Sequence, residues 1–335
     1  MAPERVARAL TGARILVTGG AGFLGSHIVR QLASIPCEIL RAGRTAAPPP
    51  APEGPARIVD VVGDVRRRRF WQQRLPGMDL VCHCAAQTSG AAADADPVTD
   101  FDTNVRPLVH LADLGRDGGR RPIVLLAGTV TELGMPQRLP ADHTHPDDPK
   151  TLYDLHKWMA GRYLLYAVRA GALRGAVLRL PNLYGPGPMA AHPDRGVLNR
   201  MIRKALDGGP LTVYGAGDSV RDYLYVEDAA RAFLMAAAAV EPVNGRHWVL
   251  GSGAGHTIAQ AFQLVAEQAA RLTGRPVPVV HQEPPAAQPA IDARHFVADP
   301  APFTRATGWR PQTTLAEGIA RTLAALQAPM TADRA

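Results

Sequence analysis

Tyr153 and Lys157 lie four residues apart in a stretch whose apolar spacing predicts a helix. This spacing places both side chains on one helix face. An ammonium group beside a phenol favours the phenolate, so such a pair can transfer a proton near neutral pH. Upstream, Thr129 follows an apolar run typical of a strand, where its hydroxyl could polarise a carbonyl and share a proton with Tyr153. Together these residues predict an acid–base centre.

A second chemical signal is the glycine pattern Gly19-x-x-Gly22-x-x-Gly25, which follows a short apolar run and opens a helical stretch. Glycines here allow a tight turn, close approach of the backbone to a pyrophosphate, and close packing of helix on sheet. The pyrophosphate then lies at the helix N-terminus, where unpaired N–H groups attract an anion. We predict a dinucleotide site that includes Phe23 and Leu24, against the alternative of a purely structural turn.

The end of the second apolar run bears on the choice of cofactor. An acid there hydrogen-bonds the adenosine ribose of NAD, whereas arginines accept the 2′-phosphate of NADP. Here no acid follows the run, and Arg41 and Arg44 do. The sequence therefore favours NADPH, unless these arginines stack on the adenine or face solvent. Asp64 and Val65, after the third run, are expected to meet the adenine.

Short apolar runs alternate with helical stretches along the chain, and this alternation predicts an α/β fold with a doubly wound parallel sheet. The predicted strands are 14–18, 38–40, 58–62, 80–84, 123–126 and 176–180, and the longest helices are 98–115 and 151–170. From about residue 181 the chain becomes rich in Pro and Gly, which indicates a smaller second lobe. We expect a cofactor domain of 1–181 and 220–250, a substrate lobe of 182–219 and 251–328, and a flexible tail of 329–335.

Composition excludes several other classes. The chain has 335 residues and three Cys, which argues against a disulfide framework. No uncharged apolar run approaches the roughly 18 residues of a membrane span, and the N-terminus lacks the apolar core of a secretory signal. The net charge of +7 is spread along the chain, with no basic face suited to nucleic acid. We expect a cytoplasmic protein.

These motifs, with Asn104 in DTNV, NLYGPG at 182–187 and RDYLYVED at 221–228, resemble the extended short-chain dehydrogenase/reductases. More narrowly, they resemble the nucleotide-sugar epimerases, dehydratases and ketoreductases, over roughly residues 12–325. The resemblance implies a Rossmann domain that holds NAD(P) and a lobe that holds a nucleoside-diphosphate sugar, with TDP favoured. It also implies a homodimer, in which the helices 98–115 and 151–170 pair with their copies.

The same resemblance implies roles for individual residues. Thr129, Tyr153 and Lys157 would be catalytic, and Lys157 would also orient the nicotinamide ribose. Further cofactor contacts would come from Ala85, Ala86 and Asn104. The sugar nucleotide would contact Thr131, Asn182, Asn199, Val213, Arg221 and, more weakly, Arg294.

Departures from the family pattern bear on the subclass. The 4,6-dehydratases carry an Asp-Glu pair directly after the catalytic Thr, where this chain has Val130 and Thr131. Decarboxylases need a carboxylate nearby, and Glu132 is out of phase by one position. With two arginines after the second strand, our first hypothesis is NADPH-dependent reduction of a nucleotide-linked 4-keto-6-deoxyhexose. One alternative is a 4-epimerase with retained NAD. Another is a non-catalytic cofactor-binding protein, and the intact set of Thr129, Tyr153 and Lys157 argues against this second alternative.

Three other groups have simpler interpretations. Cys82-His83-Cys84 lacks the distant ligand pair of a zinc site, so we predict no metal and a buried strand. His143 and His145 lie in a polar loop, where a solvated position is favoured over an extra acid. His156 lies off the Tyr153–Lys157 face, and we expect it to pack or to face solvent.

Overall fold

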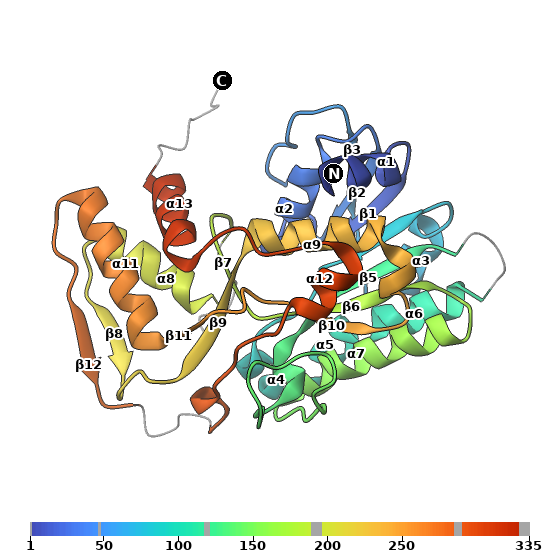
Figure 1. The fold of residues 1–335 in the computed structure, drawn as a ribbon. Coiled ribbons are helices and arrows are strands. Elements are labelled where there is room, and N and C mark those ends of the chain that lie inside the picture. Colours follow the sequence, from blue (N-terminus) through green and yellow to red (C-terminus); the bar gives the residue numbers. More distant parts are fainter. Residues whose placement is uncertain (1, 46–47, 117–120, 189–195, 285–289, 328–335) are drawn as a thin grey trace.

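The computed structural model describes residues 2–45, 48–116, 121–188, 196–284 and 290–327. Seven parallel strands form a central sheet in the order β10-β6-β5-β4-β1-β2-β3 (Figure 1). Helices cover both faces, which is why the strands read as continuous apolar runs rather than as alternating patterns. The strands are β1 (Arg14–Thr18), β2 (Glu38–Gly43), β3 (Arg57–Val62), β4 (Leu80–His83), β5 (Ile123–Thr129), β6 (Arg174–Leu180) and β10 (His247–Val249).

Alternate side chains of each strand supply two separate cores. On one face, Ile15 and Val17 of β1 pack with helices α1 (Ala2–Leu10), α2 (Phe23–Leu32) and α9 (Val226–Ala238). On the other face, Leu16 packs with α3 (Arg68–Arg74), α6 (Arg106–Leu114) and α7 (Leu152–Arg169). This layered arrangement confirms the predicted doubly wound Rossmann fold.

The predicted helix 98–115 is two helices in the structure. Helix α5 (Pro97–Asn104) ends at Val105, and α6 begins at Arg106. Pro107 explains the break, because it has no N–H to continue the helical hydrogen bonds. The other long helix, α7, runs close to its predicted range, and the Thr151 side chain caps it by accepting from the Asp154 N–H at 3.1 Å.

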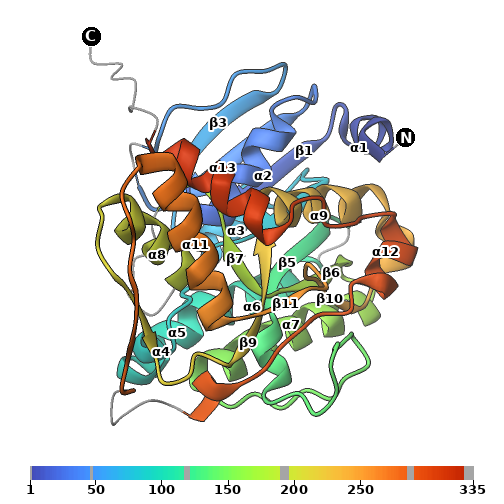
Figure 2. The same cartoon turned by 60° about the vertical axis from the view of Figure 1, so that its left-hand side comes forward.

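A smaller lobe lies beside the sheet, on the left of Figure 1 and in front in Figure 2. Its core is built from helices α8 (Val197–Leu206), α11 (Ile258–Thr273) and α13 (Leu315–Gln327). Strands β8 (Leu211–Tyr214) and β12 (Val279–Gln282) form a parallel pair on this core. A three-stranded sheet of β7 (Asn182–Tyr184), β9 (Val220–Tyr225) and β11 (Gly255–Thr257) joins the two parts of the molecule.

The chain passes between the two parts more than once. Strand β9 pairs within the small sheet, whereas α9 and β10 belong to the large one, so the segment 220–250 that we expected in the cofactor domain is divided after β9. The remaining described helices are α4 (Gly90–Ala95), α10 (Val240–Val243) and α12 (Ala301–Thr307), with two 3-10 turns, η1 (Val130–Leu133) and η2 (Ala290–Ala293). The tail predicted at 329–335 lies outside the described residues. Among the described helices, none is long and apolar enough to cross a membrane.

Candidate active site

The glycine turn between β1 and α2 is packed as a dinucleotide site requires. Gly19 has φ +66°, and a Cβ there would lie 2.9 Å from the Ala85 nitrogen. A Cβ on Gly25 would lie 2.2 Å from the Gly19 carbonyl oxygen, so only glycine lets the helix approach the turn this closely. Gly22 is the N-cap of α2, and it offers no side chain to bond the first N–H groups of the helix.

These features fit a nicotinamide dinucleotide. The N-terminal N–H groups of α2 need partners, and a pyrophosphate supplies oxygen acceptors where the helix dipole favours negative charge. Phe23 and Leu24 begin the helix at this point, as predicted, and Ala85 follows β4 directly beside Gly19. The turn and the end of β4 can therefore hold the cofactor.

The structure places the two predicted phosphate-binding arginines differently from one another. Arg41 is buried, and its Nε and Nη2 donate to both carboxylate oxygens of Asp60 at 2.6 and 2.9 Å. Its aliphatic part runs along the glycine turn, because a Cβ on Gly20 would meet the Arg41 Cγ at 2.7 Å. Arg44 is exposed after β2. Arg41 therefore has a protein partner that the sequence did not indicate.

Asp64 and Val65, which we expected at the adenine, lie at the carboxyl end of β3. The Asp64 carboxylate accepts from Arg66 Nη2 at 2.7 Å, and this hydrogen bond holds the pKa of Asp64 below its usual value. The Val65 carbonyl accepts from the indole N–H of Trp71 at 2.7 Å. Both residues are partly exposed at the sheet edge where cofactors bind in this architecture.

The predicted catalytic residues come from two neighbouring elements, since α7 packs against β5 and η1. Tyr153 and Lys157 are both buried on α7, and the Lys157 ammonium donates to the Ala127 carbonyl of β5 at 2.7 Å. Burial lowers the pKa of Lys157, against the opposing effect of Glu132. Thr129 ends β5, and its hydroxyl lies 3.0 Å from that of Thr131. This arrangement can exchange a proton with a substrate hydroxyl or ketone.

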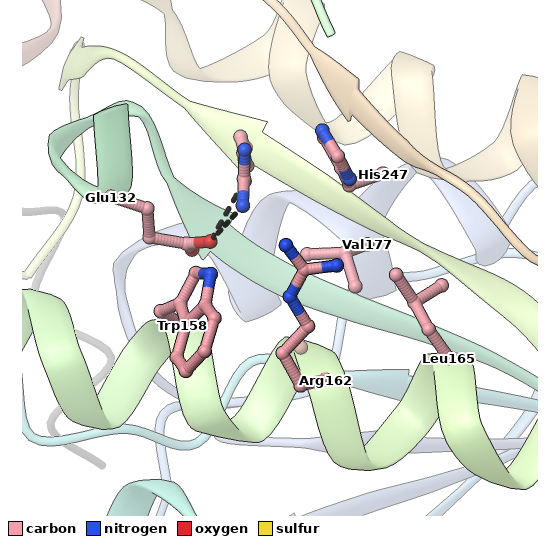
Figure 3. Close-up of a pocket in the computed structure, with 8 residues that line it drawn as sticks. Glu132, Trp158, Arg162, Leu165, Val177 and His247 are labelled. Carbon is pink, nitrogen blue, oxygen red and sulfur yellow. Dashed lines mark hydrogen bonds and ion pairs between the residues drawn. The ribbon is translucent and has the colours of Figure 1, made fainter. Parts of the chain in front are cut away.

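Glu132 does not face the substrate side of this centre. One of its oxygens accepts from the Thr129 backbone N–H at 3.0 Å. The other accepts from Arg179 of β6 at 2.7 Å, the contact that dashed lines mark at the Glu132 carboxylate in Figure 3. Arg179 also donates to Asp147 at 2.6 Å, and Asp147 accepts from the Trp158 indole at 2.8 Å. The carboxylate therefore contacts the end of β5 and is paired with Arg179.

A buried polar cluster beside α7 was not expected from the sequence. His156 Nδ1 lies 2.6 Å from the Asp100 carboxylate, and both side chains are buried. Asn104, predicted to contact the cofactor, donates to Asp100 and to the Gln87 carbonyl, at 2.9 and 3.1 Å. It thereby fixes the loop that follows Ala86. The only sequence signal for the cluster was its three polar residues within apolar helices.

The predicted sugar-nucleotide residues lie at the junction with the small lobe. Asn182 is exposed, and Asn199 accepts from the Gly185 N–H at 3.0 Å, which fixes the loop after β7. Arg221 donates to the Arg294 carbonyl, so these two arginines adjoin. The side chain of Val213 is fully buried in the core of the lobe, which leaves only its backbone for a ligand.

Cys82 and His83 are buried at the end of β4, as predicted, whereas Cys84 follows the strand and is half-buried. His83 Nδ1 lies 2.7 Å from the Thr18 hydroxyl, and burial beside Lys157 lowers the pKa of His83 to about 3. Among the described residues, no three His, Cys, Asp or Glu side chains group as metal ligands. In the polar loop, His143 packs on Trp248, with ring centroids 5.2 Å apart.

Comparison with known proteins agrees with this geometry. The model of the NAD dependent epimerase/dehydratase family matches residues 15–251. The UDP-glucose 4-epimerase of Mycolicibacterium smegmatis is 28% identical, over 92% of this chain and 97% of its own length. The crystal structure of the Thermotoga maritima UDP-glucose 4-epimerase with UDP-glucose is 27% identical, with TM-score 0.78 over 93% of this chain and 98% of the other. The Thermus thermophilus UDP-glucose 4-epimerase complex with NAD is 29% identical, with TM-score 0.76 over 94% and 99%.

Proposed function

Since the chain belongs to the NAD-dependent epimerase/dehydratase family, we propose that it is a nucleotide-sugar 4-epimerase. The observation that carries this proposal is the set of Thr129, Tyr153 and Lys157 beside η1, whose one acid, Glu132, is held by the Thr129 backbone N–H and Arg179. Val130 and Thr131 stand where an eliminating acid pair would be needed, and Glu132 is bound to Arg179. Proton exchange coupled to hydride transfer remains as the chemistry of the site.

Each catalytic residue has a defined task in this proposal. Tyr153 takes the proton of the sugar 4-hydroxyl. It returns the proton to the same oxygen after the sugar ring has rotated to present its opposite face. The Thr129 hydroxyl donates a hydrogen bond to the same oxygen, and Lys157 provides positive charge that favours the tyrosinate. A nicotinamide cofactor, held by the glycine turn and Lys157, would supply reversible hydride transfer at C4.

A 4-ketoreductase that consumes NADPH is the second candidate. Arg44 and the absence of an acid at Gly43 favour it. The pairing of Arg41 with Asp60 weakens it, because one of the two cations expected to hold a 2′-phosphate is already neutralised. The names of the most similar relatives also favour epimerisation.

The test is interconversion of UDP-glucose and UDP-galactose by the purified protein without added cofactor, with the matching TDP-sugars tried second. We expect conversion, and NAD released on denaturation. Tyr153→Phe should lower kcat by at least ~10²-fold, which is the usual contribution of a positioned acid–base group. Tyr166→Phe on the exposed side of the same helix is the matched control and should behave as wild type.

Two results would contradict the epimerase. One is stoichiometric loss of NADPH with a TDP-4-keto-6-deoxyhexose, which would establish the reductase. The other is a Tyr153→Phe protein that turns over as fast as wild type, which would remove the assigned acid–base residue.

We also propose a homodimer through α5 and α7, which pack side by side. Leu155, Tyr163 and Tyr166 are exposed at spacings that place them on one face of α7, and Val98 of α5 is 70% exposed. Burial of this apolar face would form a four-helix contact. A Tyr166→Glu variant should shift the mass measured by light scattering toward the monomer, and an unchanged dimer would contradict this interface.

A further inference from the structure

A small pocket lies beside the glycine turn at the carboxyl ends of β2 and β3. Its lining includes Ala21 of the turn, Arg41 and Gly43 of β2, and Asp60 of β3. Thr45 and Pro48, from the segment after β2, also line it. In doubly wound sheets this place, next to the turn after β1, receives the adenosine ribose of a dinucleotide.

The usual ribose-binding acid is missing from this pocket. Such an acid comes from the end of the second strand, and here that position is Gly43. A Cβ on Gly43 would have no atom within 4 Å, so the space for a side chain is present and open. Any carboxylate for the ribose must come from elsewhere.

Asp60 lies on the neighbouring strand, in register with Arg41. The Arg41 guanidinium is buried and grips both carboxylate oxygens, whereas the Asp60 side chain is 43% exposed. The hydrogen bond from Arg41 also holds the pKa of Asp60 below its usual value, so the group stays ionised. Each carboxylate oxygen keeps lone-pair capacity for another donor, because one arginine fork does not fill it.

We propose that Asp60, oriented by Arg41, selects NAD over NADP by accepting hydrogen bonds from the adenosine ribose. A ribose hydroxyl can donate to this carboxylate. A 2′-phosphate has no proton to donate at neutral pH, and it meets a like charge. Arg44 is the remaining cation near the pocket, and it is exposed and screened by solvent. The residue that sets cofactor specificity therefore lies on the third strand, β3, and not at the end of the second strand, β2.

This inference deepens the proposed function by naming its cofactor, and it is tested without any sugar. The measurement is the dissociation constant of NAD⁺ and of NADP⁺ for the purified protein, by calorimetry after removal of retained cofactor. Wild type should bind NAD⁺ more tightly. Asp60→Asn removes the charge, keeps the size and frees Arg41, so the affinity ratio should move toward NADP⁺ by ~10-fold or more.

Two further variants separate recognition from structure. Asp113→Asn changes another arginine-paired aspartate, outside this pocket, and should leave the ratio unchanged. Gly43→Asp added to Asp60→Asn returns a carboxylate to the open position on β2. It should restore much of the preference for NAD⁺, which a merely structural defect at Asp60 would not permit.

Tighter binding of NADP⁺ by wild type would overturn the proposal. An Asp60→Asn protein with an unchanged ratio and an unchanged melting temperature would overturn it equally. Because neither result depends on a sugar, failure here leaves the epimerase assay untouched. Conversely, an inactive epimerase assay leaves the cofactor ratio readable.

Discussion

Two arginines of the central sheet illustrate how burial decides what an ion pair does. Arg179 on β6 binds Glu132 and Asp147, and Arg41 on β2 binds Asp60, in each case at 2.6–2.9 Å. Both guanidinium groups are buried. The carboxylates differ, because the Glu132 side chain is 1% exposed whereas that of Asp60 is 43% exposed.

The difference separates a supporting pair from a pair that faces a ligand. Arg179 links β6, η1 and the loop before α7, and both of its partners accept further hydrogen bonds from protein donors. Arg41 satisfies one side of Asp60 and leaves the other side to a pocket. Similar distances thus give no indication of function, whereas the exposure of the anionic partner does.

The largest contrast should be in stability. Arg179→Met leaves the buried Glu132 carboxylate without its cation, which typically costs about 3–5 kcal/mol of unfolding free energy, whereas Asp147 keeps its ion pair with Arg162. Arg41→Met leaves a carboxylate that water can solvate, so we expect about 1 kcal/mol or less. Denaturant unfolding of both variants measures the difference. Equal losses, or a larger loss for Arg41→Met, would break the comparison.

The second effect should be catalytic. Glu132→Gln has a single oxygen and cannot accept from both the Thr129 N–H and Arg179, so the catalytic threonine loses its support. We expect kcat to fall about tenfold, which is about 1.4 kcal/mol, with little change in the KM for the sugar. Glu317 accepts from the Thr314 N–H in the same way at the exposed start of α13, and Glu317→Gln is the matched control. A rise in KM at unchanged kcat would assign Glu132 to binding instead.

The two pairs should also respond to pH with opposite signs. Burial, opposed by Arg179, raises the pKa of Glu132 above its usual 4.5, so the folded protein binds the extra proton. This contribution to stability is complete below pH 4.5 and is lost as pH rises through the raised pKa. The pKa of Asp60 is lowered from 3.8 by the hydrogen bond from Arg41, so its contribution is present above pH 3.8 and is lost at lower pH.

Unfolding free energies of wild type, Glu132→Gln and Asp60→Asn between pH 3 and 8 measure these slopes. Relative to wild type, Glu132→Gln should lose the decline above pH 4.5, and Asp60→Asn should lose the decline at the acid end. The same slope in both variants would show that the two carboxylates titrate alike.

The smallest effect should come from a pair with both partners at the surface. Arg68 and Asp113 lie 2.8 Å apart, and their side chains are 43% and 54% exposed. Arg68→Ala should change the unfolding free energy by only about 0.5 kcal/mol, because solvent screens such pairs. A loss as large as that of Arg179→Met would mean that burial is not the deciding variable.

The sequence predicted the layered sheet, and it placed Tyr153 and Lys157 on one helix, because these signals are local. Apolar runs, glycine spacing and the four-residue Tyr153–Lys157 interval can all be read along the chain. Arg179 and Asp147 are 32 positions apart, and Arg41 and Asp60 are 19 apart, so their pairing depends on strand register and loop path. Asp60 is visible in the sequence as a single acid in an apolar strand. Its role could not be interpreted without knowing that Arg41 lies beside it on β2. The break at Pro107 within the predicted helix 98–115 became evident only in the structure.

Strand β10 is the last strand of the large sheet to be synthesised. When β6 has just been synthesised, β10 is the one strand of the large sheet that is still missing. The outer edge of β6 therefore lacks its partner. That edge is filled only when residues 244–249 arrive, with Gly245 donating to the Gly175 carbonyl and Leu250 to that of Arg179. The chain between β6 and β10 contains α8 and β8 of the small lobe, whereas α11 and α13 follow β10, so the large sheet is complete before the core of the small lobe has been made. A fragment that stops at residue 181 would carry an open, apolar sheet edge, which favours aggregation.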